Sequence, residues 1–159
     1  MEEDQAERFM RRAIDLGRRG ADAGHGGPFG AVIVKQGEIV GEGWNQVIAS
    51  NDPTAHGEIE AIRDACTRLG SFDLGGCDLY TSGEPCPMCL GAIYWARIER
   101  VFYGFSIQDA AEAGFDDRFI FEQLDLPRKK REIPATQVLG DEAAAVLRAF
   151  AADPDRVRY

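Results

Sequence analysis

Two short motifs, each near the predicted start of a helix, constrain the fold of this chain most. One reads His56-Gly57-Glu58, and the other, Pro-Cys-Pro-Met-Cys, ends at Cys89. Prolines close to each motif suit first helical positions, which predicts helices over 53–69 and 85–96. The chain must therefore fold so that two helix starts can meet.

The side chains of these motifs have the types and spacing of a zinc site. His56, Cys86 and Cys89 offer one imidazole and two thiols, and the cysteines lie one helical turn apart at the positive end of a helix dipole, which favours thiolates. Catalytic zinc sites commonly use three protein ligands and leave the fourth position to water. Glu58 is suited to move protons to and from that water, and the combined H-x-E and P-C-x-x-C pattern is typical of nucleobase deaminases. We expect one zinc ion per subunit and Glu58 as the catalytic acid/base.

A structural zinc site is the non-enzymatic alternative, because two cysteines separated by two residues are ambiguous by themselves. Cys66 or Cys77 could act as a fourth ligand and close the site. Cys66 continues the apolar face begun by Ile59 and Ile62, and Cys77 opens a predicted strand, so we expect both in the core. Glu58 favours catalysis, since a structural site needs no carboxylate beside its ligand.

The order of the predicted elements indicates one α/β domain over 1–159. The first half is expected to form a helix at 2–20, a strand hairpin at 31–35 and 38–44, and the first motif helix. The second half is expected to form a strand at 77–82, the second motif helix, a strand at 100–106, a loop at 110–117, a short strand at 137–139 and a helix at 141–152. Alternating strands and helices predict a three-layer α/β/α sandwich, with a central mixed sheet flanked by helices.

Charge and composition exclude several classes of protein. The net charge of −9 argues against a nucleic-acid-binding protein, because such proteins bind through a basic face. The basic run 128–131 is expected to be a solvated loop, with nucleic-acid contact as the minority interpretation. The acidic start does not resemble a secretion signal, and no apolar stretch is long enough to span a membrane. We expect a reducing, cytoplasmic location.

The longest motif carries a family resemblance. Residues 81–97, Thr-Ser-Gly-Glu-Pro-Cys-Pro-Met-Cys-Leu-Gly-Ala-Ile-Tyr-Trp-Ala-Arg, resemble the cytidine deaminase superfamily, and this stretch is also similar to tRNA adenosine deaminases. Segments 26–35, 50–56 and 109–117, together with Tyr159, are most similar to the bacterial guanine deaminases. This resemblance implies a fold of the cytidine deaminase type.

The resemblance also implies roles for individual residues. His56, Cys86 and Cys89 match the zinc ligands, and Glu58 matches the catalytic glutamate. The other matching positions are Asn45 as a hydrogen-bonding partner of the purine, Phe29 as a ring in the base pocket, Asp117 as a second carboxylate at the departing amino group, and Tyr159 as a C-terminal aromatic that enters a site. Phe115 is a second candidate for stacking on the base.

The implied reaction is hydrolysis of guanine to xanthine and ammonia. In this family the C-terminal segment is exchanged between two subunits, which implies a domain-swapped homodimer through a tail at about 135–159. Guanosine, an ammeline-like triazine, cytosine or a tRNA adenosine stay open as alternative substrates. The resemblance departs at Gly57, where alanine is usual, and at Gly83, where related chains carry cysteine.

Overall fold

The computed structural model describes residues 2–159, with side chains from residue 4 onward. Its internal contacts divide the chain into two compact units, one ending at Phe121 and the other running from Glu122 to Tyr159. All candidate site residues except Tyr159 belong to the first unit. Within the described residues, no helix is long and apolar enough to cross a membrane.

The first unit is built on a four-stranded mixed sheet, as predicted. Its strands are β1 (Gly30–Lys35), β2 (Glu38–Trp44), β3 (Cys77–Gly83) and β4 (Arg100–Phe105), in the order β2-β1-β3-β4. β1 is antiparallel to β2 and β3, whereas β3 and β4 are parallel. The hairpin between β1 and β2 turns on Gln36 and Gly37, whose φ angles are both positive, at 52° and 80°. Two such residues match the twist of the strands they join.

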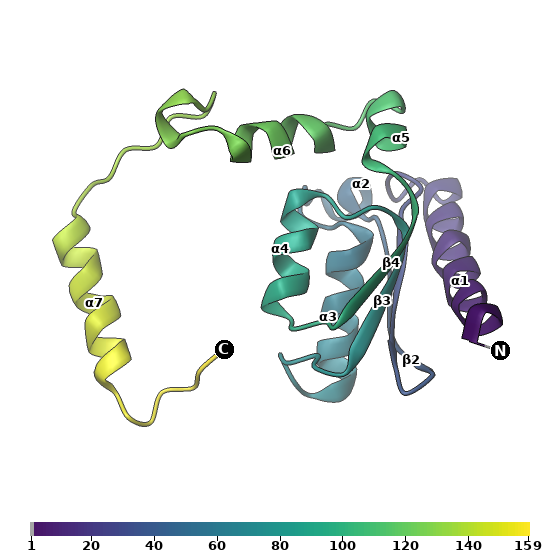
Figure 1. Ribbon diagram of the computed structural model, residues 1–159, viewed down its shortest axis with the longest axis horizontal. Helices are drawn as coiled ribbons and strands as arrows, with labels where there is room; N and C mark the ends of the chain where they lie inside the picture. Colours follow the sequence, from purple (N-terminus) through teal and green to yellow (C-terminus); the bar gives the residue numbers. More distant parts are fainter. Residues whose placement is uncertain (1) are drawn as a thin grey trace. The chain divides into compact units, whose positions relative to one another are not determined.

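Helices cover both faces of the sheet (Figure 1). α1 (Glu2–Asp22) lies on one face, and α3 (Gly57–Leu69) and α4 (Pro87–Trp95) lie on the other. Alternate residues of β1 serve the two sides: Val32 and Val34 join the core with Phe9 of α1, while Ala31 and Ile33 join the core under α3 and α4. The three-layer sandwich is therefore confirmed, and its alternation follows from the period of two in a strand.

The two motif helices begin later than predicted. α3 starts at Gly57 with His56 as its N-cap, because Asp52 accepts hydrogen bonds from the backbone N–H and hydroxyl of Thr54 and so closes a local turn. A short helix that the sequence did not predict, α2 (Val47–Ser50), precedes this turn.

α4 starts at Pro87 with Cys86 as its N-cap. Two metal-ligand candidates, His56 and Cys86, therefore occupy the caps of two helices. The backbone of a cap residue is extended rather than helical, so its side chain can point off the helix end.

The segment after β4 is helical where a loop was predicted. α5 (Ile107–Glu112) begins in a capping box, in which Ser106 and Asp109 each accept a hydrogen bond from the other's backbone N–H. α6 (Asp117–Asp125) follows after a turn at Gly114, whose φ is 95°. The Ser-x-x-Asp spacing at 106–109 was the signal for a helix start.

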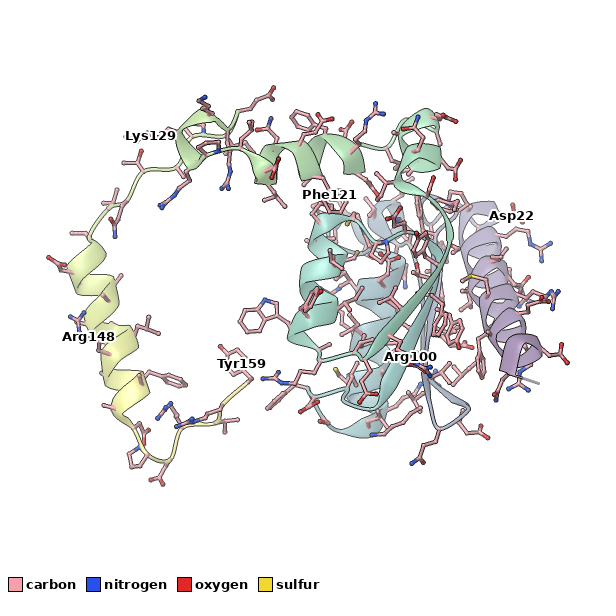
Figure 2. All side chains as sticks on the ribbon, in the orientation of Figure 1. Asp22, Arg100, Phe121, Lys129, Arg148 and Tyr159 are labelled. Carbon is pink, nitrogen blue, oxygen red and sulfur yellow. The ribbon has the colours of Figure 1, made fainter. Side chains whose placement is uncertain are left out.

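The second unit contains the end of α6, a 3₁₀ turn η1 (Arg128–Lys130) and α7 (Gly140–Ala152). Figure 2 shows its side chains, with Lys129 and Arg148 labelled. The predicted strand at 137–139 is wrong: these residues form no strand, and no other segment of this unit is a strand with which they could pair. Residues 128–130 of the basic run are exposed, as expected, whereas Arg131 is half-buried and donates a hydrogen bond to the Gln123 carbonyl.

Candidate active site

Three ligand atoms of the predicted zinc site are brought together at the helix starts. His56 Nδ1 lies 3.5 Å from Cys86 Sγ and 3.4 Å from Cys89 Sγ, and all three atoms lie within 4.8 Å of one another. One imidazole and two thiolates are ligands that zinc prefers, and three protein ligands are the number found in catalytic sites. The donor set therefore fits zinc. Cys66 and Cys77 pack in the core under α3 and α4 instead, as predicted.

Electrostatics around the two cysteines favour one thiolate before any cation binds. Hydrogen bonding from Cys89 and from the His56 ring lowers the pKa of Cys86 to about 4. The neighbouring Cys86 in turn raises the pKa of Cys89, and burial adds to that effect. The hydrogen bond with Cys86 raises the pKa of His56. A dication held by these ligands favours loss of the remaining protons, because coordination requires Cys⁻ and neutral His.

Glu58 sits in the first turn of α3, two residues after the His56 cap, and only 5% of it is exposed. Burial raises the pKa of its carboxyl group. The Thr81 hydroxyl donates to Glu58 Oε1 over 3.0 Å. A carboxyl group whose pKa is raised binds a proton more readily and is suited to both accept and return one.

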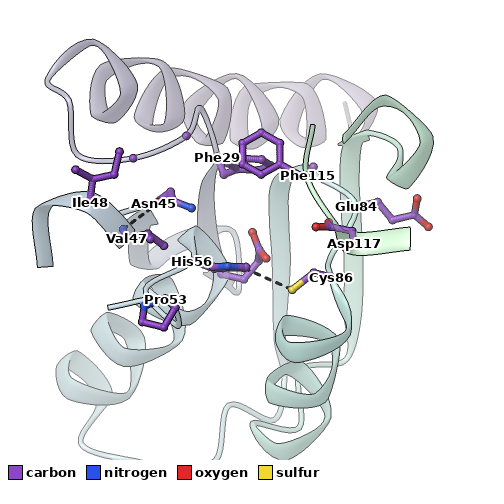
Figure 3. A pocket seen from close by; sticks show the side chains of 14 residues that line it. Phe29, Asn45, Val47, Ile48, Pro53, His56, Glu84, Cys86, Phe115 and Asp117 are labelled. Atoms are coloured by element: carbon purple, nitrogen blue, oxygen red, sulfur yellow. Dashed lines mark hydrogen bonds between the residues drawn. The ribbon is translucent and has the colours of Figure 1, made fainter. Parts of the chain in front are cut away.

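A cavity of about 510 Å³ opens beside these residues (Figure 3). Its volume is within the range of small-molecule sites, about 300–1,000 Å³. The cavity is lined by Gly26, Gly27, Phe29, Asn45, Val47, Ile48, Pro53, His56, Glu58, Gly83, Glu84, Cys86, Phe115 and Asp117. Every predicted site residue of the first unit therefore lines it, except the ligand candidate Cys89, which is fully buried.

Asn45 presents a polar group of known orientation to the cavity. It is 7% exposed, and its Oδ1 accepts a hydrogen bond from the Val47 backbone N–H over 3.1 Å. This bond assigns Oδ1 to the protein and leaves the Nδ2 amide to donate to a ligand. A Cβ on Gly26 would overlap Asn45 Oδ1, so glycine is required there. The glycine-rich loop thus permits a close backbone approach, as expected.

Two phenylalanine rings form one wall of the cavity, and a third packs on one of them. Phe29 packs edge-to-face on Phe115, with ring centroids 4.8 Å apart, and on Phe105, with centroids 5.5 Å apart. Phe29 and Phe115 line the cavity, whereas Phe105 contacts Phe29 without lining it. Flat aromatic walls with few polar anchors are suited to a planar heterocycle.

Asp117 opens α6 and lines the cavity with Glu58. Burial raises the pKa of its carboxyl group, and the charge of Cys86 raises it further. Glu58 and Asp117 therefore line the same cavity, each with a reason to bind a proton more tightly than usual. Tyr159 ends the second unit, where it is 71% exposed.

The sequence did not identify two residues that support the site. Thr81 is fully buried on β3 and holds Glu58. Glu84 accepts a hydrogen bond from the backbone N–H of Ile107 and so ties the segment before Cys86 to the start of α5. Both lie inside the longest motif, but their partners are distant in sequence, so no local pattern could assign them.

Comparisons with known proteins agree with this geometry. The family model for the "Cytidine and deoxycytidylate deaminase zinc-binding region" matches residues 3–105. Guanine deaminase of Bacillus subtilis (strain 168) is 57% identical over 144 residues, 91% of this chain and 92% of that protein. The tRNA-specific adenosine deaminase of Aquifex aeolicus (strain VF5) is 38% identical over the same shares of the two chains.

Solved structures give the same relationship. The X-ray structure of guanine deaminase from Bacillus subtilis superimposes with a TM-score of 0.92 at 54% identity, over 96% of this chain and 98% of that one. The guanine deaminase from Nitrosomonas europaea gives 0.67 at 30% identity, over 91% and 84%. With its zinc-ligand cluster and buried glutamate in place, this chain belongs to the zinc-binding family of cytidine and deoxycytidylate deaminases.

Proposed function

We propose that this enzyme hydrolyses guanine to xanthine and ammonia. The observation that carries the proposal is one cavity that combines a three-ligand zinc site, two carboxyl groups with raised pKa values and a single oriented amide. The high identity to a guanine deaminase over most of both chains supports guanine as the base. The reaction adds water at C2 of guanine and expels the amino group.

Zinc bound by His56, Cys86 and Cys89 would lower the pKa of a coordinated water to about 7 and so supply hydroxide at neutral pH. Glu58 accepts a proton from the water and delivers it to the adjacent ring nitrogen, N3. Asp117, on the same cavity, delivers a proton to the amino group as it leaves C2, and this proton is replaced by the one that the oxygen added at C2 loses when it becomes the carbonyl of xanthine. Two carboxyl groups suit this task because protons must be both removed and delivered in one cycle.

Recognition of the base follows from the walls of the cavity. The Asn45 amide can donate to an acceptor on the purine, and guanine offers N7 and the O6 carbonyl. Phe29 and Phe115 provide flat apolar surface for the ring. Few polar anchors and large apolar walls favour a free base over a charged nucleotide.

The direct test is to load the protein with zinc, add guanine, and measure xanthine by absorbance and ammonia by a coupled assay. We expect equal amounts of both products. Guanosine, ammeline, cytosine and a tRNA carrying the target adenosine serve as comparison substrates. A higher kcat/KM for any of them than for guanine would refute the proposed substrate while leaving the deaminase class intact.

A tRNA substrate is not favoured. Nucleic acids are bound through basic surface, and the net charge of this chain is −9. If tRNA were the substrate, its binding would weaken steeply between 50 and about 200 mM salt. Guanine turnover should show no such dependence.

We further propose that the enzyme is a homodimer in which the C-terminal segment of one subunit covers the other. The second unit contains α7, whose apolar side chains Val146, Leu147 and Phe150 are 52–71% exposed, and residue 159 is an exposed tyrosine. Such a helix is stable only when its apolar face is buried. In this arrangement Tyr159 of the exchanged segment enters the active site of the partner.

Complementation can test this exchange. The Glu58→Gln subunit supplies an intact tail with a defective site, and a Tyr159→Ala subunit supplies an intact site with a defective tail. If tails are exchanged, a dimer of the two contains one site with both parts intact, so co-expression restores guanine turnover. A mixture no more active than the sum of its parts would refute the exchange. The reduced thiols of all four cysteines agree with our proposal of a cytoplasmic location.

A further inference from the structure

Thr81 lies on an inner strand of the sheet and buries a polar hydroxyl group there. It is 0% exposed and pairs with Ala31 of β1 on one side and Tyr103 of β4 on the other. Valine has nearly the same shape, favours strands and has no polar atom to bury. A buried hydroxyl is costly unless it is hydrogen-bonded, so its partners indicate its role.

The hydroxyl has two partners at the same distance. Thr81 Oγ1 lies 3.0 Å from Glu58 Oε1 and 3.0 Å from the carbonyl oxygen of Gly83. The carbonyl can only accept, whereas a hydroxyl can both donate and accept. Thr81 can therefore hold Glu58 Oε1 whether or not that oxygen carries a proton.

These contacts join two parts of the site whose relative positions matter for catalysis. Glu58 comes from α3, and Gly83 ends β3 just before the segment that carries Cys86. Thr81 links the Glu58 carboxyl to this segment through one oxygen. The carboxyl group that Thr81 holds in this way is the one that lines the cavity.

We propose that Thr81 is the positioning residue for Glu58: its hydroxyl fixes the carboxyl group relative to the segment that supplies the zinc ligands. This inference rests on the proposed function, in which Glu58 transfers the protons. It predicts that Thr81 affects the rate of the chemical step rather than the binding of the base.

Two substitutions separate positioning from packing. Thr81→Val keeps the shape and removes the hydroxyl, whereas Thr81→Ser keeps the hydroxyl and removes a methyl group. Because a misplacement of about 1 Å can cost about 100-fold in rate, we expect Thr81→Val to lower kcat about 10- to 100-fold. KM for guanine and zinc content should stay near wild type, and Thr81→Ser should retain most of kcat. Turnover is compared at a temperature at which both variants are folded.

Several outcomes would overturn the proposal. A Thr81→Ser variant that loses as much kcat as Thr81→Val would indicate packing alone, and so would a Thr81→Val variant with unchanged kcat. Crystal structures of the zinc-loaded variants give a readout that needs no substrate. We expect the Glu58 carboxyl group to move in Thr81→Val and to stay in Thr81→Ser. An unmoved Glu58 in Thr81→Val refutes positioning even if guanine is not the substrate, whereas a wild type inactive on guanine refutes only the substrate.

Discussion

Gly83 gives the sharpest prediction about the shape of the base pocket. It ends β3, lines the cavity and faces the Phe105 ring across the parallel pair of strands. A Cβ at this position would lie 2.4 Å from Cε2 and Cζ of Phe105. Carbon atoms pack at about 3.5–4.0 Å, so in Gly83→Ala the ring must move by about 1 Å.

Movement of the Phe105 ring would be passed to a residue of the cavity wall. Phe105 packs edge-to-face on Phe29, which lines the cavity. Overpacking of this kind typically costs about 1–3 kcal/mol, so we expect Gly83→Ala to lower the free energy of unfolding by that amount. The Phe29 wall should shift towards the base, and KM for guanine should rise more than kcat falls.

Gly91→Ala is the matched control, because no atom lies within 4 Å of the added Cβ and the site is an exposed helical position of α4. Alanine there should stabilise the protein by about 0.5–1 kcal/mol through helix propensity. Both variants are compared by denaturant unfolding and by steady-state kinetics on guanine. The double variant Gly83→Ala/Phe105→Leu should recover part of the loss. Equal stability and equal KM in Gly83→Ala and wild type would refute the steric argument.

Three further predictions follow from the site and its surroundings. Zinc binding to the metal-free protein at pH 7 should release about one proton or more, because Cys89 keeps its proton while Cys86 is already ionised. Calorimetry in buffers of different ionisation enthalpy measures the number of protons released, and zinc binding without proton release would contradict the prediction. Asn45→Ala and Asn45→Asp should each lower kcat/KM for guanine about 5- to 150-fold, the equivalent of about 1–3 kcal/mol for a lost buried hydrogen bond. Aspartate keeps an acceptor for the Val47 N–H but has no amide to donate, so a fully active Asn45→Asp variant would exclude donation by the amide. Hydrogen bonds from Ser106 lower the pKa of Asp109, so its stabilising effect should be complete above the unfolded pKa of about 3.9 and be lost as the pH falls through the lowered folded value. The unfolding midpoints of Asp109→Ala and wild type should therefore differ by a constant amount above about pH 4 and converge only below it; a difference that persists unchanged at lower pH would contradict the capping role.

The sequence predicted the sheet and the zinc ligands because both depend on local signals. The positive φ angles at Gln36 and Gly37 fit the hairpin that the sequence indicated. The spacing of Cys86 and Cys89 places both thiols at one helix start, and the histidine motif lies at another. Local spacing was sufficient there because a helix start fixes where such side chains point.

Other features of the fold were predicted less well. Asp52 has a residue type that often caps helices, but it accepts hydrogen bonds from Thr54 that close a turn instead, and His56 is the N-cap. The segment 137–139 was predicted to be a strand, yet it forms none in its own unit. The link from Thr81 to Glu58 spans two elements that no local pattern joins. Contacts between side chains of different elements depend on how the elements pack, and local sequence patterns do not predict that packing.

The central claim is that Glu58 moves the protons of a zinc-dependent deamination of guanine, and one comparison tests it most directly. Zinc content and guanine turnover are measured on wild type and Glu58→Gln prepared in parallel. Loss of a general acid/base typically costs about 10²–10⁴-fold in rate. We predict one zinc per subunit in both proteins, rapid release of xanthine and ammonia by wild type, and a loss of that size in the variant. A zinc-loaded Glu58→Gln enzyme with near wild-type turnover would contradict the account.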